Sequence, residues 1–174
     1  MCGIKQFHKY QSRPFSMTFL MCFALLSAMF FQAGIVHAAV VSWTNPAGGL
    51  WTTASNWSTG AVPGATDDAF ITLDGTYTVT LNGIRSINSL TLGDAANTGV
   101  QTLLIEANST FGSASLTVAN GVTNAGSLTL DNTSASGFSS NLTLTSGTLT
   151  NAATGVLNVN ATGTGGGGRT ISAN

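Results

Sequence analysis

Short runs in which apolar and polar residues alternate recur along the chain after residue 75. Examples are "TYTVTL" (76–81), "SLTL" (89–92), "SLTV" (115–118) and "NLTL" (141–144). A period of two is the pattern of a half-buried β-strand, with Leu and Val facing inward and Thr or Asn facing outward. No stretch after Ala38 has a convincing helical period, so the sequence predicts a chain that is nearly all β.

The spacing of these runs indicates how the strands are organised. Leu90, Leu116 and Leu142 follow one another at equal intervals, and Leu103 and Leu128 fall between them. A recurrence of this length without helices is typical of a β-solenoid, in which each turn buries its apolar face against its neighbours. We therefore predict a parallel β-solenoid. An antiparallel β-sandwich is the alternative, because its strands also recur at short, regular intervals.

The segment from Met1 to Ala38 differs in kind from the rest of the chain. Lys5, Lys9 and Arg13 precede the uncharged run "FSMTFLMCFALLSAMFFQAGIV", and small residues follow in "VHAA". This order is typical of a secretory signal peptide with cleavage after Ala38. An uncleaved anchor is the alternative, because the apolar run approaches the ~20 residues that cross a bilayer. We expect a secreted protein, or one at the bacterial cell surface.

Composition after Ala38 narrows the classes of function. Thr, Gly, Ser and Asn make up more than half of this part, and six carboxylates against Arg85 and Arg169 give a net charge of −4. Without a basic cluster, we expect no nucleic-acid partner. All His, Cys and Lys residues lie in the leader. Nucleophilic triads and zinc sites are therefore disfavoured, and we expect a non-enzymatic protein without a cofactor.

The carboxylates carry the remaining candidate chemistry. Asp94 and Glu106 are the nearest candidates for a pair that hydrolyses polysaccharide, although each follows a turn or a strand end, where acids are usually just solvated. Asp67 and Asp68 could contribute oxygen ligands to a calcium site. The favoured alternative is a turn in "PGATDDA", in which these side chains accept backbone N–H bonds before a strand at Phe70.

Trp43, Trp51 and Trp57 lie close together just after the leader. Flat indole faces could form a platform that stacks on sugars, with host or environmental polysaccharides or cell-surface glycans as partners. The favoured alternative is a plug, because the first turn of a solenoid needs a cover and large aromatic side chains bury much area.

The repeats resemble those of a known class of protein. "TNAGSLTL" and "GTLTNAATGVLNV", followed by "GTGGGGRTISAN", resemble the repeat regions of large bacterial autotransporter-like and filamentous-haemagglutinin-like surface adhesins. "LWTTASNWSTGAVPGATDDAFITL" resembles the Trp-rich segment that precedes such repeats. The resemblance implies a right-handed parallel β-helix with a Trp-rich cap over residues 39–84, repeats over 85–174, and a structural or adhesive role.

Two departures from that pattern shape the remaining expectations. The chain has neither a C-terminal barrel for translocation nor an arginine-tipped sorting tail, and it stops where a further repeat is expected. We therefore expect the N-terminal piece of a longer protein, attached to a membrane only through the leader or a missing C-terminal region. A carbohydrate-binding module and the first part of a polysaccharide-degrading β-helix enzyme are the alternative functions.

Overall fold

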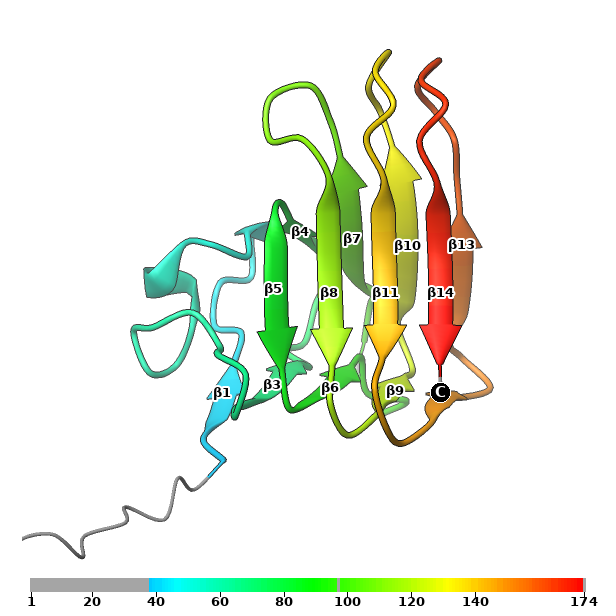
Figure 1. Cartoon of the computed structure of the whole chain (residues 1–174). Helices are drawn as coiled ribbons and strands as arrows, with labels where there is room; N and C mark the ends of the chain where they lie inside the picture. Colours follow the sequence, from blue (N-terminus) through cyan, green and yellow to red (C-terminus); the bar gives the residue numbers. More distant parts are fainter. Residues whose placement is uncertain (1–37, 97, 174) are drawn as a thin grey trace, which may run out of the picture. The chain divides into compact units, whose positions relative to one another are not determined.

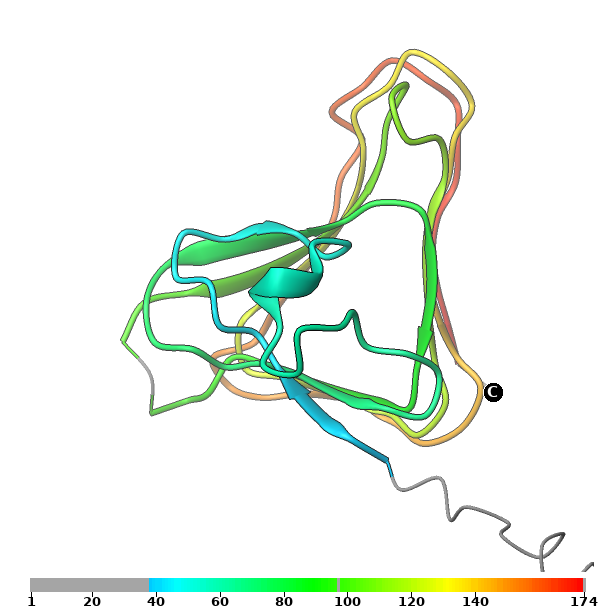
Figure 2. The same ribbon diagram turned by 90° about the vertical axis from the view of Figure 1, so that its left-hand side faces the viewer.

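Three parallel β-sheets form the three sides of a solenoid of about five turns in the computed structural model, which describes residues 38–96 and 98–173 (Figures 1 and 2). The first face consists of β1 (Val40–Ser42), β3 (Asp68–Ile71), β6 (Ser89–Leu92), β9 (Val122–Asn124) and β12 (Leu149–Asn151). The second face consists of β2 (Gly49–Leu50), β4 (Tyr77–Leu81), β7 (Gln101–Ala107), β10 (Ser127–Asn132) and β13 (Val156–Val159). The third face consists of β5 (Ile84–Ile87), β8 (Ala114–Val118), β11 (Ser140–Leu144) and β14 (Arg169–Ala173).

All pairs between these strands are parallel. The predicted solenoid is therefore confirmed, and the antiparallel sandwich is wrong. In Figure 1 the second face runs upward behind and the third runs downward in front, while the chain advances from left to right. The coil is consequently right-handed, as expected for crossovers between parallel strands.

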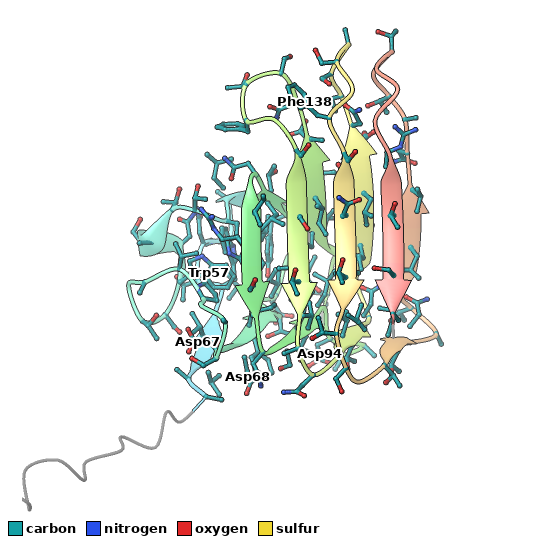
Figure 3. The ribbon with its side chains drawn as sticks, viewed as in Figure 1. Trp57, Asp67, Asp68, Asp94 and Phe138 are labelled. Atoms are coloured by element: carbon teal, nitrogen blue, oxygen red, sulfur yellow. The ribbon has the colours of Figure 1, made fainter. Side chains whose placement is uncertain are left out.

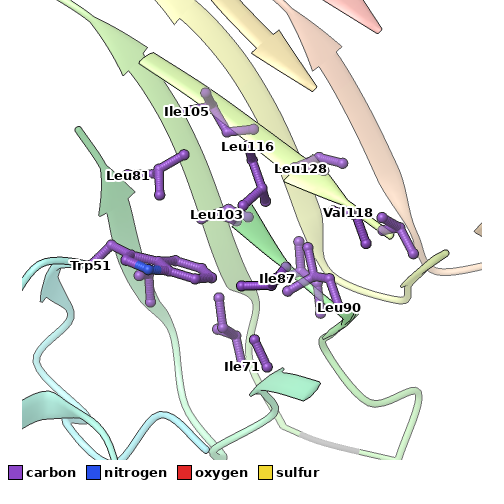
Figure 4. Close-up of a cluster of buried hydrophobic side chains, with 14 of the residues drawn as sticks. Trp51, Ile71, Leu81, Ile87, Leu90, Leu103, Ile105, Leu116, Val118 and Leu128 are labelled. Atoms are coloured by element: carbon purple, nitrogen blue, oxygen red, sulfur yellow. The ribbon is translucent and has the colours of Figure 1, made fainter. Parts of the chain in front are cut away.

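Alternation along each strand creates the core. In β7 every second residue is buried, and Leu103 and Ile105 are fully inaccessible to solvent. Their register neighbours in β10, Leu128 and Leu130, are also fully buried. Figure 4 shows such side chains from successive turns gathered in one cluster. Each one that is fully buried stabilises the fold by about 1.5 to 3 kcal/mol relative to exposure.

Of the equally spaced leucines, only Leu116 and Leu142 are one solenoid turn apart. Leu116 and Leu142 are register neighbours on the third face. Leu90 lies on the first face, where its neighbour is Val122. The column of register neighbours on the third face advances by unequal steps, through Arg85, Leu116, Leu142 and Ile171. The three equally spaced leucines therefore do not lie on one face, because Leu90 belongs to the first face and Leu116 and Leu142 to the third. The intervening leucines implied two strands per turn, whereas each turn has three.

The Trp-rich segment lies at the N-terminal end of the coil. Its short 3₁₀ helix η1 (Ala54–Asn56) and the loop around it lie across this end in Figure 2. The strands β3 and β4, which belong to the predicted segment 39–84, already pair within the first and second faces. Solenoid pairing therefore begins before the predicted boundary at residue 85.

The corner between the second and third faces changes most from turn to turn. Its connection comprises residues 82–83, 108–113, 133–139 and 160–168 in successive turns. The three longer loops stand side by side along the solenoid axis and project as a ridge (Figures 1 and 2). Ser139 N–H donates to Ser113 Oγ at 3.1 Å, and Gly168 N–H donates to Ser139 Oγ at 3.1 Å. Side-chain hydrogen bonds therefore connect each loop to the next.

Candidate functional site

The three tryptophans pack against one another inside the molecule. Trp43 and Trp57 meet edge to face with centroids 5.1 Å apart, and Trp51 and Trp57 meet at 4.7 Å. Each indole is at most 2% exposed. Trp43 Nε1 donates to the Asn45 carbonyl at 2.6 Å, and Trp57 Nε1 donates to the Trp51 carbonyl at 2.8 Å. The proposed sugar platform is wrong, because no indole face is open to a ligand.

Asp67 and Asp68 both accept hydrogen bonds, Asp67 within a local turn of the chain and Asp68 from the next turn of the solenoid. Asp67 Oδ2 accepts the Gly64 N–H at 2.8 Å, which is the bond that the turn interpretation predicts. Asp68 Oδ1 accepts from Asn88 Nδ2 at 2.7 Å and from Ser89 Oγ at 2.6 Å, both in the next turn. Within residues 38–96 and 98–173, no three His, Cys, Asp or Glu side chains gather closely enough to hold a metal ion. The calcium hypothesis thus gains no further ligand from these residues.

Asp94 and Glu106 are far apart. Asp94 precedes the start of β7, and Glu106 is the last residue but one of that strand. Five residues of extended chain already span about 17 Å, well beyond the ~5 to 10 Å that separates paired glycosidase carboxyls. Figure 3 shows Asp94 at the lower edge, opposite the ridge that carries Phe138. The structure therefore does not bring the two predicted catalytic carboxylates together.

Glu106 and Asp131 instead connect turns. They are register neighbours near the C-terminal ends of β7 and β10. Glu106 Oε1 accepts the Thr133 hydroxyl at 2.9 Å, and Asp131 Oδ2 accepts the Thr162 hydroxyl at 2.8 Å. Asp131 Oδ1 also accepts the Thr162 N–H at 3.1 Å. Each carboxylate therefore fixes the start of the loop in the following turn.

A shallow trough lies on the outer surface of the first face. It has a volume of about 440 Å³. Its lining residues come from four turns: Phe70, Thr72, Thr91, Gly93, Asp94, Ala95, Thr123, Ala125 and Ala152. One outward row of register neighbours is Phe70, Thr91, Thr123 and Thr150. The adjacent row consists largely of small residues, so the trough is deeper there. These residues are Gly93, Ala125 and Ala152.

The connection between β6 and β7 contributes Gly93, Asp94 and Ala95 to the lining of the trough. It comprises residues 93–100, whereas the same corner of the next turn needs only residues 125–126. Asp94 lies near the start of this connection, and its Oδ1 accepts the Ala96 N–H at 2.9 Å. A second hollow of about 250 Å³, lined in part by Asp94 and Val100, lies beside it. The start of the longer connection therefore lines both hollows.

Charge and side-chain chemistry give the trough a neutral to slightly acidic character. Asp94 is its only charged lining residue. Arg85 and Arg169, the two basic side chains after Ala38, belong to β5 and β14 of the third face. Phe70 is half-buried, which leaves part of its ring accessible. Within the described part of the chain, the hydroxyls of Thr91 and Thr123 form no hydrogen bond.

Sequence reasoning missed this trough. Phe70 follows the conspicuous "DDA", and Thr91 and Thr123 are two among many outward threonines. Register brings these three residues together although the steps between them along the chain differ in length. The one local signal was the long polar connection after "SLTL", because loops that interrupt a regular scaffold often carry function.

Among the described residues, no helix has the length and apolar character needed to span a bilayer. The predicted signal peptide lies outside these residues apart from Ala38. Comparison with known proteins found no matching family model, no matching curated protein and no matching solved structure. The resemblance to surface adhesins therefore stays a prediction.

Proposed function

We propose that this protein is an exported, non-enzymatic β-solenoid with a structural or adhesive role at the bacterial cell surface. The observation that carries the proposal is the regular stack of parallel turns, which presents three polar faces rich in threonine. A stack of this kind extends a binding surface in one dimension, because each turn adds strands to every face. Such a surface suits contact with an extended partner better than chemistry on a small molecule.

The placement of the acids supports a structural role for them. Asp68, Glu106 and Asp131 each accept hydrogen bonds from a neighbouring turn, and Asp67 accepts one within its own turn. Catalytic carboxyl groups would face a common cleft at short separation. Asp94 and Glu106, at opposite ends of β7, do not meet that requirement. These positions favour adhesion or scaffolding over hydrolysis of polysaccharide.

Export is the part of the proposal that is most directly testable. The complete chain would be expressed in a Gram-negative bacterium. Cell fractionation would then locate the protein, and N-terminal sequencing would identify its first residue. We expect an exported form that begins at Ala39, because cleavage after Ala38 fits the small residues at that point. A form that retains Met1 and stays in the cytoplasm would contradict the proposal.

Adhesion needs a separate measurement. Beads that carry the exported chain would be counted on surfaces coated with polysaccharides and with host glycoproteins, beside beads that carry an unrelated protein of similar charge. We expect retention on at least one polysaccharide surface that exceeds that of the control beads. Equal retention of both bead types on every surface would leave only a structural role.

A further inference from the structure

We propose that the trough on the first face binds a neutral, linear glycan that lies along the solenoid axis. This inference rests on the proposed adhesive function and names the class of ligand for it. The ligand would stack on Phe70 and accept or donate hydrogen bonds at Thr91, Thr123 and Asp94. All four residues line the same trough.

The geometry of the trough matches a ligand with a repeat. Phe70, Thr91 and Thr123 line the trough as one row across three turns. Neighbouring strands in a sheet lie about 4.8 Å apart, so this row spans roughly 10 Å. The volume of the trough, about 440 Å³, falls within the ~300 to 1,000 Å³ that is usual for ligand sites. A linear polymer that lies along this row can therefore stack on Phe70 and meet a threonine hydroxyl in each of the next two turns.

The chemistry of the lining fits a sugar. A pyranose ring has an apolar C–H face and a rim of hydroxyl groups, and the partly exposed ring of Phe70 is suited to contact the former. The hydroxyls of Thr91 and Thr123 have no partner within the described residues, so they remain free to donate or accept. Ala125 and Ala152 keep the floor low enough for a ring to approach.

Asp94 is held in position for this role. Its Oδ1 accepts the Ala96 N–H at 2.9 Å, which fixes the side chain at the rim of the trough. The carboxylate is exposed, so it keeps acceptor capacity for ligand hydroxyl groups. Hydrogen bonds to a charged acceptor are stronger than those between neutral groups. Asp94 therefore favours a donor-rich neutral ligand and repels an anionic one.

Other ligand classes fit this surface poorly. Neither Arg85 nor Arg169 lines the trough, so it offers no positive charge to a phosphate, a uronate or a nucleic acid. A peptide strand would need free backbone N–H and C=O groups. The backbone of β6 is already paired with β3 on one side and β9 on the other. Recognition must therefore use side chains.

The test uses affinity electrophoresis of the full chain in gels that contain one soluble polysaccharide each. The neutral probes are hydroxyethyl cellulose, laminarin, xylan and galactomannan, and the anionic probe is polygalacturonate. We expect at least one neutral probe to retard the wild-type protein. Phe70→Ala should weaken that retardation at least tenfold. Phe111→Ala is the matched control, because Phe111 is 46% exposed on the ridge, outside the trough.

Smaller substitutions sharpen the assignment. Thr91→Val and Asp94→Asn should each weaken binding about three- to tenfold. Thr117→Val on the third face and Asp74→Asn in an exposed turn are the controls, and both should bind as the wild type does. Ala125→Phe should block binding by filling the trough. Circular dichroism and a thermal melt of every variant separate lost binding from lost folding.

Each outcome decides between the alternatives. Retardation by no neutral probe, or by polygalacturonate alone, overturns the glycan trough. Binding that Phe70→Ala, Thr91→Val and Ala125→Phe all leave unchanged also overturns it, although another face could then carry adhesion. If beads with Phe70→Ala adhere as well as wild-type beads, the adhesive function stands and the trough assignment fails. If wild-type beads do not adhere at all, the adhesive function itself fails.

Discussion

The two ends of the solenoid differ in how far their apolar side chains are exposed to solvent. At the N-terminal end, Trp43, Trp51 and Trp57 are at most 2% exposed. In the last described turn, Leu157 is 39% exposed and Val159 is 56% exposed. Leu157 is nevertheless the register neighbour of Leu128, which is fully buried. The same inward position is therefore core in one turn and surface in another.

This difference shows where burial comes from in a repetitive fold. The inward direction of a side chain is set within its own strand, but its removal from water depends on the next layer. At the N-terminal end the three tryptophans belong to the buried core cluster, whereas apolar side chains of β13 are exposed. We expect the contribution of an inward residue to stability to follow this cover rather than its residue type.

The largest effect is expected at the covered end. Trp51→Ala should lower the free energy of unfolding by about 3 to 5 kcal/mol, because it removes a fully buried indole that packs on Trp57. Urea unfolding followed by circular dichroism measures the change. Phe111→Ala, on the exposed ridge, is the control and should cost less than about 1 kcal/mol. Equal costs for the two variants would contradict the interpretation of this segment as a cap.

A comparison within one column should give the next largest effect. Leu128→Ala should lower the free energy of unfolding by about 2 to 5 kcal/mol, since it opens a cavity in a fully covered turn. Leu157→Ala makes the same chemical change at the exposed neighbour, and we expect roughly half that cost or less. Denaturant midpoints of the two variants, measured side by side, test the difference. Equal losses would show that another layer covers β13 in solution.

The smallest effect concerns pH. Burial raises the pKa of the Tyr77 hydroxyl from 10.0 to about 12. Between these values the unfolded chain loses the proton while the folded chain keeps it, so stability should fall as pH rises from about 10 to about 12. Below pH 10 this contribution stays constant. Urea midpoints measured from pH 9 to 12 should fall for the wild type relative to Tyr77→Phe above pH 10, and a constant difference between the two would contradict the raised pKa.

Much of the architecture could be predicted from the sequence. Alternation in "SLTL" and "SLTV" correctly placed Leu90 and Leu116 inside and the intervening threonines outside. The period was harder to interpret. Strands of three faces share the same Leu-Thr-Leu pattern, so the spacing of leucines does not reveal which of them stack. Only the pairing of whole strands fixes that register.

The candidate site was less accessible to sequence reasoning. For the tryptophans the sequence favoured a plug over a sugar platform, because the first turn of a solenoid needs a cover, and the structure shows the three rings buried against one another. The turn role of Asp67 was also predicted from "PGATDDA". The trough was not, since Phe70, Thr91 and Thr123 come from turns of different length. Nothing local in the sequence distinguishes these threonines from those of other strands.

The ridge at the corner between the second and third faces has a consequence for variation and engineering. Its connections grow from two residues to six, seven and nine, yet the strands on either side stay in register. Bonds from Thr133 to Glu106 and from Thr162 to Asp131 anchor the two longest loops near their bases. Insertions at the loop tips therefore do not reach the core. This corner is where foreign epitopes could be grafted in tandem, one per turn, at a spacing that the strands themselves define.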